Sequence, residues 1–140
     1  MDAPRFAGLL AALSPQTSVQ WNLYNAISVW KAWDAAGRPC RGTPDVRNDA
    51  KRFHTELKTG ETSNPRKFQW KVRDFCYHGQ LAWYADGAVA AGKPAPEAHY
   101  IVAIEAKAPY VVTVFSIGAK TIDLGRRLIR LWTEHLDACE

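Results

Sequence analysis

The fold is decided by one stretch in which apolar and polar side chains alternate, Arg52-Phe53-His54-Thr55-Glu56-Leu57-Lys58-Thr59. Alternation with a period of two, in a run rich in β-branched and aromatic residues, predicts a β-strand. Successive side chains of a strand point to opposite faces, so Glu56 and Lys58 project from the same face, which His54 shares. A carboxylate and an ammonium group are therefore expected side by side on one strand.

Upstream of this strand, two runs and their turns predict a helix and a hairpin. The apolar run that ends near Leu13 predicts a short helix, and the alternating run from Ala26 to Trp33 predicts a strand. Asp34-Ala35-Ala36-Gly37 is a turn sequence, so Pro39 to Arg47 is expected to return as the second strand of a hairpin. Asn48-Asp49 marks the next turn.

Downstream, Ser63 or Asn64 can cap a helix with Pro65 in its first turn, and the helical stretch, which can contain a break, is expected to reach Ala91. Further strands are expected at Tyr100 to Ala106 and Tyr110 to Ile117, followed by a helix from Ala119 to Ala138. The order α-β-β-β-α-β-β-α predicts an α/β (α+β) domain, with a mixed sheet flanked by helices.

Length and composition are those of an ordinary globular chain. The 140 residues fit one domain, 1–140, and the 47% hydrophobic and 23% charged residues are near the globular average. No apolar run approaches the roughly 20 residues that span a bilayer, and no secretion signal is evident, so a cytoplasmic protein without membrane partners is expected. The three cysteines, Cys40, Cys76 and Cys139, are widely spaced, which disfavours a zinc ribbon and predicts thiols.

Positive charge is concentrated in one segment. Between Arg38 and Arg73 there are ten Lys/Arg against four Asp/Glu, a net +6, while the rest of the chain is 8 − 10 = −2. Such a segment favours a polyanionic partner such as DNA, because Lys and Arg neutralise phosphates. The candidate phosphate-binding residues are Arg41, Arg47, Arg66, Lys67, Lys71 and Arg73.

The chemistry is expected where Asp45, after Pro44, meets the central strand. If the two strands are neighbours, Asp45 and Glu56 can approach each other, and with the Leu57 backbone carbonyl they offer oxygen ligands for Mg²⁺, or for Mn²⁺. Such an ion can polarise a phosphodiester and activate water. Lys58 would then orient the water or offset the charge that develops on phosphorus.

The segment from Cys40 to Asp45, followed after ten residues by Glu56-Leu57-Lys58-Thr59, resembles the core of the RecE (exonuclease VIII) family of PD-(D/E)xK nucleases. Downstream, Tyr77-His78-Gly79-Gln80-Leu81-Ala82-Trp83-Tyr84-Ala85-Asp86-Gly87 is similar to that family's Tyr-His-x-Gln-x-x-x-Tyr-x-Asp-Gly helix. The similarity begins near Trp30 and covers most of the chain. It implies a restriction-endonuclease-like fold, with Gln80 and Tyr84 added to the catalytic set of Asp45, Glu56 and Lys58.

On physical grounds, Gln80 and Tyr84 share a helical face with Tyr77. Gln80 could bind a phosphate or a metal-bound water, and Tyr84 could contact the DNA backbone or support Lys58. Tyr77 and Trp83 are expected to pack in the core. His54 could line the site, His78 could cap or pack, and Glu105 is expected to be structural.

The chain also departs from the family pattern. RecE-like enzymes have an upstream helical region whose motif ends in a metal-site His, whereas residues 1–25 contain neither His nor Glu. The chain thus resembles a nuclease domain without that region, or an inactive relative. Glu56 stands where RecE itself has Asp, a change that the PD-(D/E)xK pattern permits.

Three functions remain open from the sequence. The resemblance implies a Mg²⁺-dependent exonuclease acting on DNA ends in recombination or phage DNA metabolism, with possible homo-oligomerisation and a recombination partner protein. The alternatives are a structure-specific endonuclease, such as a junction resolvase, and a non-catalytic DNA-binding relative.

Overall fold

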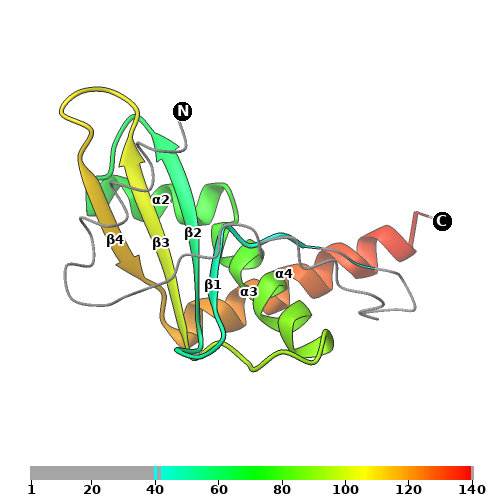
Figure 1. Ribbon diagram of the computed structural model, residues 1–140. Helices are drawn as coiled ribbons and strands as arrows, with labels where there is room; N and C mark the ends of the chain where they lie inside the picture. The colour runs from blue at the N-terminus through cyan, green and yellow to red at the C-terminus, as the bar shows by residue number, and fades with distance from the viewer. Residues whose placement is uncertain (1–39, 41, 140) are drawn as a thin grey trace.

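The computed structural model describes residue 40 and residues 42–139, which form a mixed sheet with helices on one of its faces (Figure 1). The prediction of mixed α and β structure is confirmed. The expected helix up to Leu13 and the expected strand from Ala26 to Trp33 lie outside the described residues. Within the described part of the chain, no helix has the length and hydrophobicity needed to cross a membrane.

The sheet has four strands in the order β1-β2-β3-β4. These are β1 (Val46–Asn48), β2 (Phe53–Gly60), β3 (Ala98–Glu105) and β4 (Val112–Ser116). Strands β2 and β3 are parallel, whereas β1 and β4 each pair antiparallel with their neighbour. Parallel strands need a crossover connection, and two helices, α2 (Pro65–Asp74) and α3 (Tyr77–Ala90), lie in it.

Most of the predicted elements are present. Strand β2 matches the alternating stretch, β3 and β4 match the two later strands, and the last element is α4 (Ala119–Asp137). Of the two predicted caps, Ser63 and Asn64, it is Asn64 that caps α2, because its side chain accepts hydrogen bonds from two backbone amides of the first turn. The predicted helical stretch is divided into α2 and α3 at Phe75 and Cys76, where Cys76 has a φ of 54°.

The predicted strand from Pro39 to Arg47 is wrong over most of its length, because β1 begins only at Val46. Gly42 and the two residues that follow it have no regular secondary structure. Pro44 is buried and has no N–H to donate to a ladder, which disfavours a strand interior at this position. The segment instead runs close to the side chain of Tyr84 on α3.

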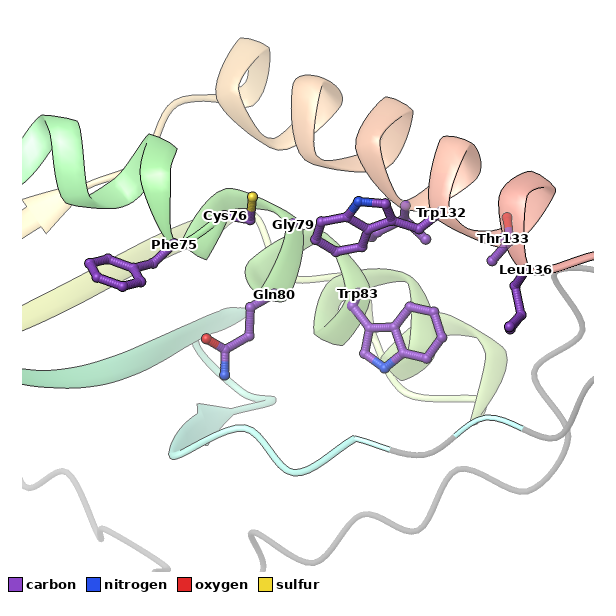
Figure 2. Close-up of a pocket in the computed structure, with 9 residues that line it drawn as sticks. Phe75, Cys76, Gly79, Gln80, Trp83, Trp132, Thr133 and Leu136 are labelled. Carbon is purple, nitrogen blue, oxygen red and sulfur yellow. The ribbon is translucent and has the colours of Figure 1, made fainter. Parts of the chain in front are cut away.

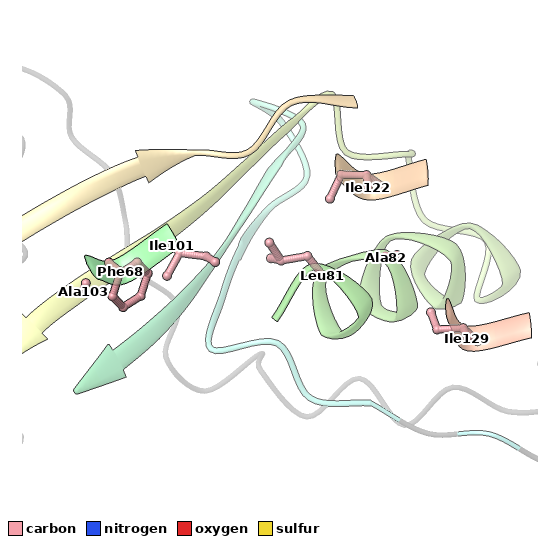
Figure 3. Packing of buried hydrophobic residues seen from close by; sticks show 7 residues of the cluster. All are labelled: Phe68, Leu81, Ala82, Ile101, Ala103, Ile122 and Ile129. Carbon is pink, nitrogen blue, oxygen red and sulfur yellow. The ribbon is translucent and has the colours of Figure 1, made fainter. Parts of the chain in front are cut away.

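The hydrophobic core lies between the sheet and the helices. In the β2–β3 register Glu56 pairs with Ile101 and Lys58 with Ala103, so the polar residues of β2 share their face with core residues of β3. That face is covered by the helices (Figure 3). The buried cluster consists of Phe68, Leu81, Ala82, Ile101, Ala103, Ile122 and Ile129.

Helices α3 and α4 cross at small residues. A Cβ atom placed on Gly125 would lie 2.2 Å from the backbone carbonyl oxygen of His78 and 3.0 Å from Cβ of Ala82. The crossing is also fixed by Arg126, whose guanidinium donates to both carboxylate oxygens of Asp86 at 2.8–3.1 Å. This crossing holds α3, and hence Gln80 and Tyr84, against the sheet.

Candidate functional site

Two side chains of β2 form the centre of the candidate site. Glu56 is buried, with 2% of its surface exposed, while Lys58 two residues further along is only partly buried. Lys58 Nζ donates to Glu56 Oε2 at 3.3 Å. The predicted pairing of a carboxylate and an ammonium group on one strand face is therefore present.

Asp45 joins this pair immediately before β1. The backbone N–H of Asp45 donates to Glu56 Oε1 at 3.3 Å, and the backbone N–H of Leu57 donates to Asp45 Oδ2 at 2.8 Å. The Glu56 carboxylate thus accepts from the Asp45 backbone, and the Asp45 carboxylate accepts from the residue that follows Glu56. Asp45 is exposed, so its carboxylate can be reached from solvent.

A chain of polar contacts then extends from β2 to α3. Lys58 Nζ donates to Gln80 Oε1 at 2.7 Å, and Gln80 Nε2 donates to the Tyr84 hydroxyl oxygen at 3.1 Å. Lys58 Nζ also lies 4.8 Å from the ring centroid of Tyr77, within the range of a cation–π contact. All five residues predicted to be catalytic are brought together, and Gln80 contacts both Lys58 and Tyr84.

The electrostatics of the site are dominated by Glu56. Burial, followed by repulsion from the Asp45 carboxylate, raises the pKa of Glu56 from 4.5 to about 7, although Lys58 acts in the opposite direction. Burial also raises the pKa of Tyr84, with smaller contributions from the charges of Glu56 and Asp45. Tyr84 is therefore a phenol at neutral pH, and because its oxygen accepts from Gln80, its own proton can be donated to another group.

The donors at this site suit a hard divalent cation. N–H and C=O of one strand residue point to the same edge, so the Leu57 carbonyl shares the edge at which its N–H meets Asp45. Among the described residues no group of three or more His, Cys, Asp or Glu could hold a metal ion, so the set here is two carboxylates and a carbonyl. Mg²⁺ is commonly held by one or two carboxylates while it keeps several waters. The repulsion between Asp45 and Glu56 is what a cation would relieve.

Gly42 is a site residue that the sequence analysis missed. A Cβ atom at this position would lie 2.8 Å from two ring carbons of Tyr84 and 3.4 Å from a ring carbon of Trp83. A side chain at position 42 would therefore force either Tyr84 or the segment that carries Asp45 to shift. The glycine is visible in the Arg-Gly-Thr-Pro-Asp sequence, but the need for it follows only from the nearby position of Tyr84 in the fold.

We expect Gly42→Ala to displace either Tyr84 or the segment before Asp45, and to lower the melting temperature by several degrees and reduce Mg²⁺ affinity. Overpacking of this kind costs about 1–3 kcal/mol. Tyr84→Ala removes the ring that the new methyl group would meet, so Gly42→Ala should cost much less in that background. Thermal melts of the four proteins in this double-mutant cycle measure the coupling, and additive effects would contradict a steric clash.

The candidate phosphate-binding residues are spread over several elements and do not gather at the site. Arg41 lies outside the described residues, and the others are Arg47, Arg66, Lys67, Lys71 and Arg73. Arg47 is engaged by Asp49 and by the Pro94 carbonyl, and Arg73 pairs with its neighbour Asp74. Arg66 and Lys67 are exposed in the first turn of α2.

The remaining candidates have structural contacts. His54 shares the face of Glu56, as predicted, but it is buried with 1% exposed and its Nε2 lies 2.6 Å from His99 Nδ1. Burial, with the nearby charges of His99 and Arg47, lowers the pKa of His54 to about 3, so it is neutral in the fold. Glu105 accepts hydrogen bonds from Ser63 N and Oγ, which fixes the loop before α2. These contacts place His54 and Glu105 in the scaffold.

A largely apolar pocket of about 460 Å³ lies beside the site, and Gln80 contributes to its lining. Figure 2 shows Gln80 and Trp83 projecting from the same side of α3, with Trp132 on α4. Tyr77 and Trp83 are both partly buried and pack against the core cluster, in keeping with the prediction, and Trp83 also lines the pocket. The pocket borders the same amide that contacts Lys58.

No protein-family model matches the chain, and none of the curated proteins is significantly similar to it.

Proposed function

We propose that this protein is a Mg²⁺-dependent deoxyribonuclease of the PD-(D/E)xK type, which hydrolyses DNA phosphodiester bonds at the site of Asp45, Glu56 and Lys58. The observation that carries the proposal is the meeting of these three groups, linked by hydrogen bonds of 2.8–3.3 Å. On this proposal the fold is restriction-endonuclease-like. A mixed sheet with a helical crossover between its parallel strands is compatible with that class.

Asp45, Glu56 and the Leu57 carbonyl would hold the ion. When bound, Mg²⁺ would polarise the scissile phosphate and help to activate the attacking water. Lys58, already 2.7 Å from Gln80 and 3.3 Å from Glu56, would orient that water or offset negative charge on the phosphorane.

Gln80 and Tyr84 act as a pair in this proposal. The Gln80 amide has its oxygen on Lys58 and its nitrogen on the Tyr84 hydroxyl, so its orientation is fixed from both sides. The Tyr84 proton can then be donated to a non-bridging phosphate oxygen. Exposed Arg66 and Lys67 would contact the phosphate backbone further along the strand.

Cleavage assays on three matched DNA substrates test the proposal and its substrate class. With Mg²⁺, an exonuclease that acts on DNA ends degrades linear duplex but not covalently closed plasmid, whereas a junction resolvase cuts a four-way junction. EDTA should abolish cleavage, and an RNA duplex of the same sequence tests the preference for DNA. Cleavage that persists in both Lys58→Ala and Glu56→Ala would rule out this site.

Metal affinity should depend on pH because Glu56 must lose its proton to bind a cation. Its pKa is about 7 in the fold, so binding below pH 7 has to release a proton. We expect the Mg²⁺ or Mn²⁺ affinity to fall about tenfold for each pH unit below 7 and to level off above it. Calorimetry at pH 6, 7 and 8 measures this.

The controls for that titration are close in the chain. Asp45→Asn should weaken binding at every pH, whereas replacement of the exposed Glu61 by Gln should change nothing. An affinity that is constant between pH 6 and 8, or one that Asp45→Asn leaves intact, would contradict metal binding at these carboxylates.

A non-catalytic DNA-binding protein is the second candidate. It is favoured by the small number of ligands, since the described residues contribute only two carboxylates to the site. It predicts DNA binding that weakens with salt and no cleavage with any divalent ion. Metal binding without cleavage would favour this candidate, while cleavage dependent on Lys58 would exclude it.

A further inference from the structure

Strand β4 (Val112–Ser116) is the last strand of the sheet, and no described residue hydrogen-bonds to its outer side. Figure 1 shows it at the end of the sheet opposite β1. An edge strand offers unpaired N–H and C=O groups to any other strand, so proteins usually protect such edges with charges, prolines or bulges. A β4 edge without such protection would be able to pair with another strand.

The β4 residues whose backbone faces outward can be identified from the register. Ile117 N donates to His99 O, and Glu105 N donates to Val111 O, so the odd-numbered residues face β3. Antiparallel ladders alternate, so the N–H and C=O groups of Val112, Val114 and Ser116 point away from β3. Three successive outward-facing residues present three donors and three acceptors.

Among residue 40 and residues 42–139, none of the usual protective features is found along this edge. Residues 108–119 contain no Asp, Glu, Lys, Arg or His, and no proline lies within β4. The Val114 side chain is 50% exposed at the centre of the strand, and the register with β3 runs without interruption from Tyr100 to Ile104. An uninterrupted, uncharged edge of this kind favours pairing with another strand.

We propose that the outer edge of β4 pairs antiparallel with the β4 strand of a second copy of this chain, about a twofold axis at Val114. The partner is a second copy because the edge is complementary to itself. With Val114 opposite Val114, Val112 falls opposite Ser116 of the second copy, so all three outward-facing residues form hydrogen-bonded pairs. Such an interface is isologous and closes as a dimer.

The pairing places no like charges together and continues the sheet from four strands to eight across the dimer. It leaves Asp45, Glu56 and Lys58 away from the interface, because β1 and β4 lie at opposite ends of the strand order. The dimer is therefore independent of the proposed nuclease activity, and each proposal can fail without the other.

Sedimentation velocity over a range of concentrations tests the pairing. The wild-type chain of 15.7 kDa should sediment with about twice that mass. Val114→Pro removes an outward-facing N–H without removing a bond to β3, and proline is tolerated on edge strands with that orientation. The dissociation constant of the dimer should rise at least about a hundredfold.

Val114→Lys is the second variant, because it places two ammonium groups together at the twofold axis. It should also sediment as a monomer, whereas the control Val114→Thr, which keeps both backbone groups and the β-branched shape, should remain a dimer. Circular dichroism checks that each variant is folded. A wild-type chain that stays monomeric at about 200 µM overturns the proposal. A dimer that survives both Val114→Pro and Val114→Lys also overturns the proposal. A dimer that survives these two changes but is lost in Leu131→Glu would lie on the exposed face of α4 instead.

Discussion

Glu56→Gln is expected to reduce DNA cleavage by at least about a thousandfold and, at the same time, to stabilise the fold at neutral pH. The loss of activity follows because an amide is a poor ligand for Mg²⁺. The gain in stability follows because the buried Glu56 has a pKa of about 7, above its ordinary value of 4.5. Keeping it ionised in the fold therefore costs free energy, on the order of 3 kcal/mol above pH 7.

The sign of this effect gives it a specific pH dependence. A group whose pKa is higher in the folded state favours folding at low pH, and that contribution is lost as the pH rises to the folded pKa. The stability difference between Glu56→Gln and wild type should therefore be small near pH 4.5 and grow until about pH 7. Urea denaturation at several pH values measures it. Acidification also destabilises both proteins through the buried His54, but that effect cancels in the difference.

Lys58→Met is the matched variant for this prediction. It removes the Lys58 charge, which lowers the pKa of Glu56, so it should abolish cleavage while making the fold less stable at pH 8. The two variants thus share one effect on activity and have opposite effects on stability. A Glu56→Gln protein that is less stable than wild type at pH 8 would contradict the prediction, because it would show that ionised Glu56 does not destabilise the fold. Full cleavage by either variant would place the chemistry elsewhere.

The parts of the site that could be predicted are those set by local periodicity. Alternation along β2 places Glu56 and Lys58 on one face, and helical spacing places Gln80 beside Tyr84. Turn chemistry likewise located the start of α2 at Ser63 or Asn64, and Asn64 is the cap. In each case the residues are at most four positions apart, so the backbone geometry of one element determines the contact.

Contacts between distant segments could not be predicted in this way. The buried pair of His54 and His99 exists because β2 and β3 align these two residues, and no sequence pattern gives the register of two parallel strands joined by a long crossover. The short length of β1 has a partly tertiary origin, because Gly42 must pass Tyr84. Gly42 and Pro44 are in addition poor strand formers.

Gly125→Ala should destabilise the protein by about 3 kcal/mol or more, a large effect for one methyl group, and should leave much of it unfolded at 37 °C. The added Cβ atom would lie 2.2 Å from the His78 carbonyl oxygen and 2.7 Å from its carbon, both in the α3 backbone. Because backbone atoms cannot rotate away as a side chain can, α3 and α4 would have to separate. On an exposed helix alanine would instead stabilise, since it is the better helix former.

The matched control is Gly118→Ala at the start of the same helix. Gly118 has a φ of −73°, and no atom lies within 4 Å of its added Cβ, so alanine meets neither strain nor a clash there. Its melting temperature should fall by only a few degrees, because the loss of Gly at an N-cap costs about 1 kcal/mol, well below the cost of the clash at Gly125. Separation of the helices would also move Gln80, which α3 holds against Lys58, so residual folded Gly125→Ala protein should bind Mg²⁺ more weakly. Wild-type stability in Gly125→Ala would mean that α3 and α4 do not touch at this glycine, and the positions of Gln80 and Tyr84 would then have to be revised with them.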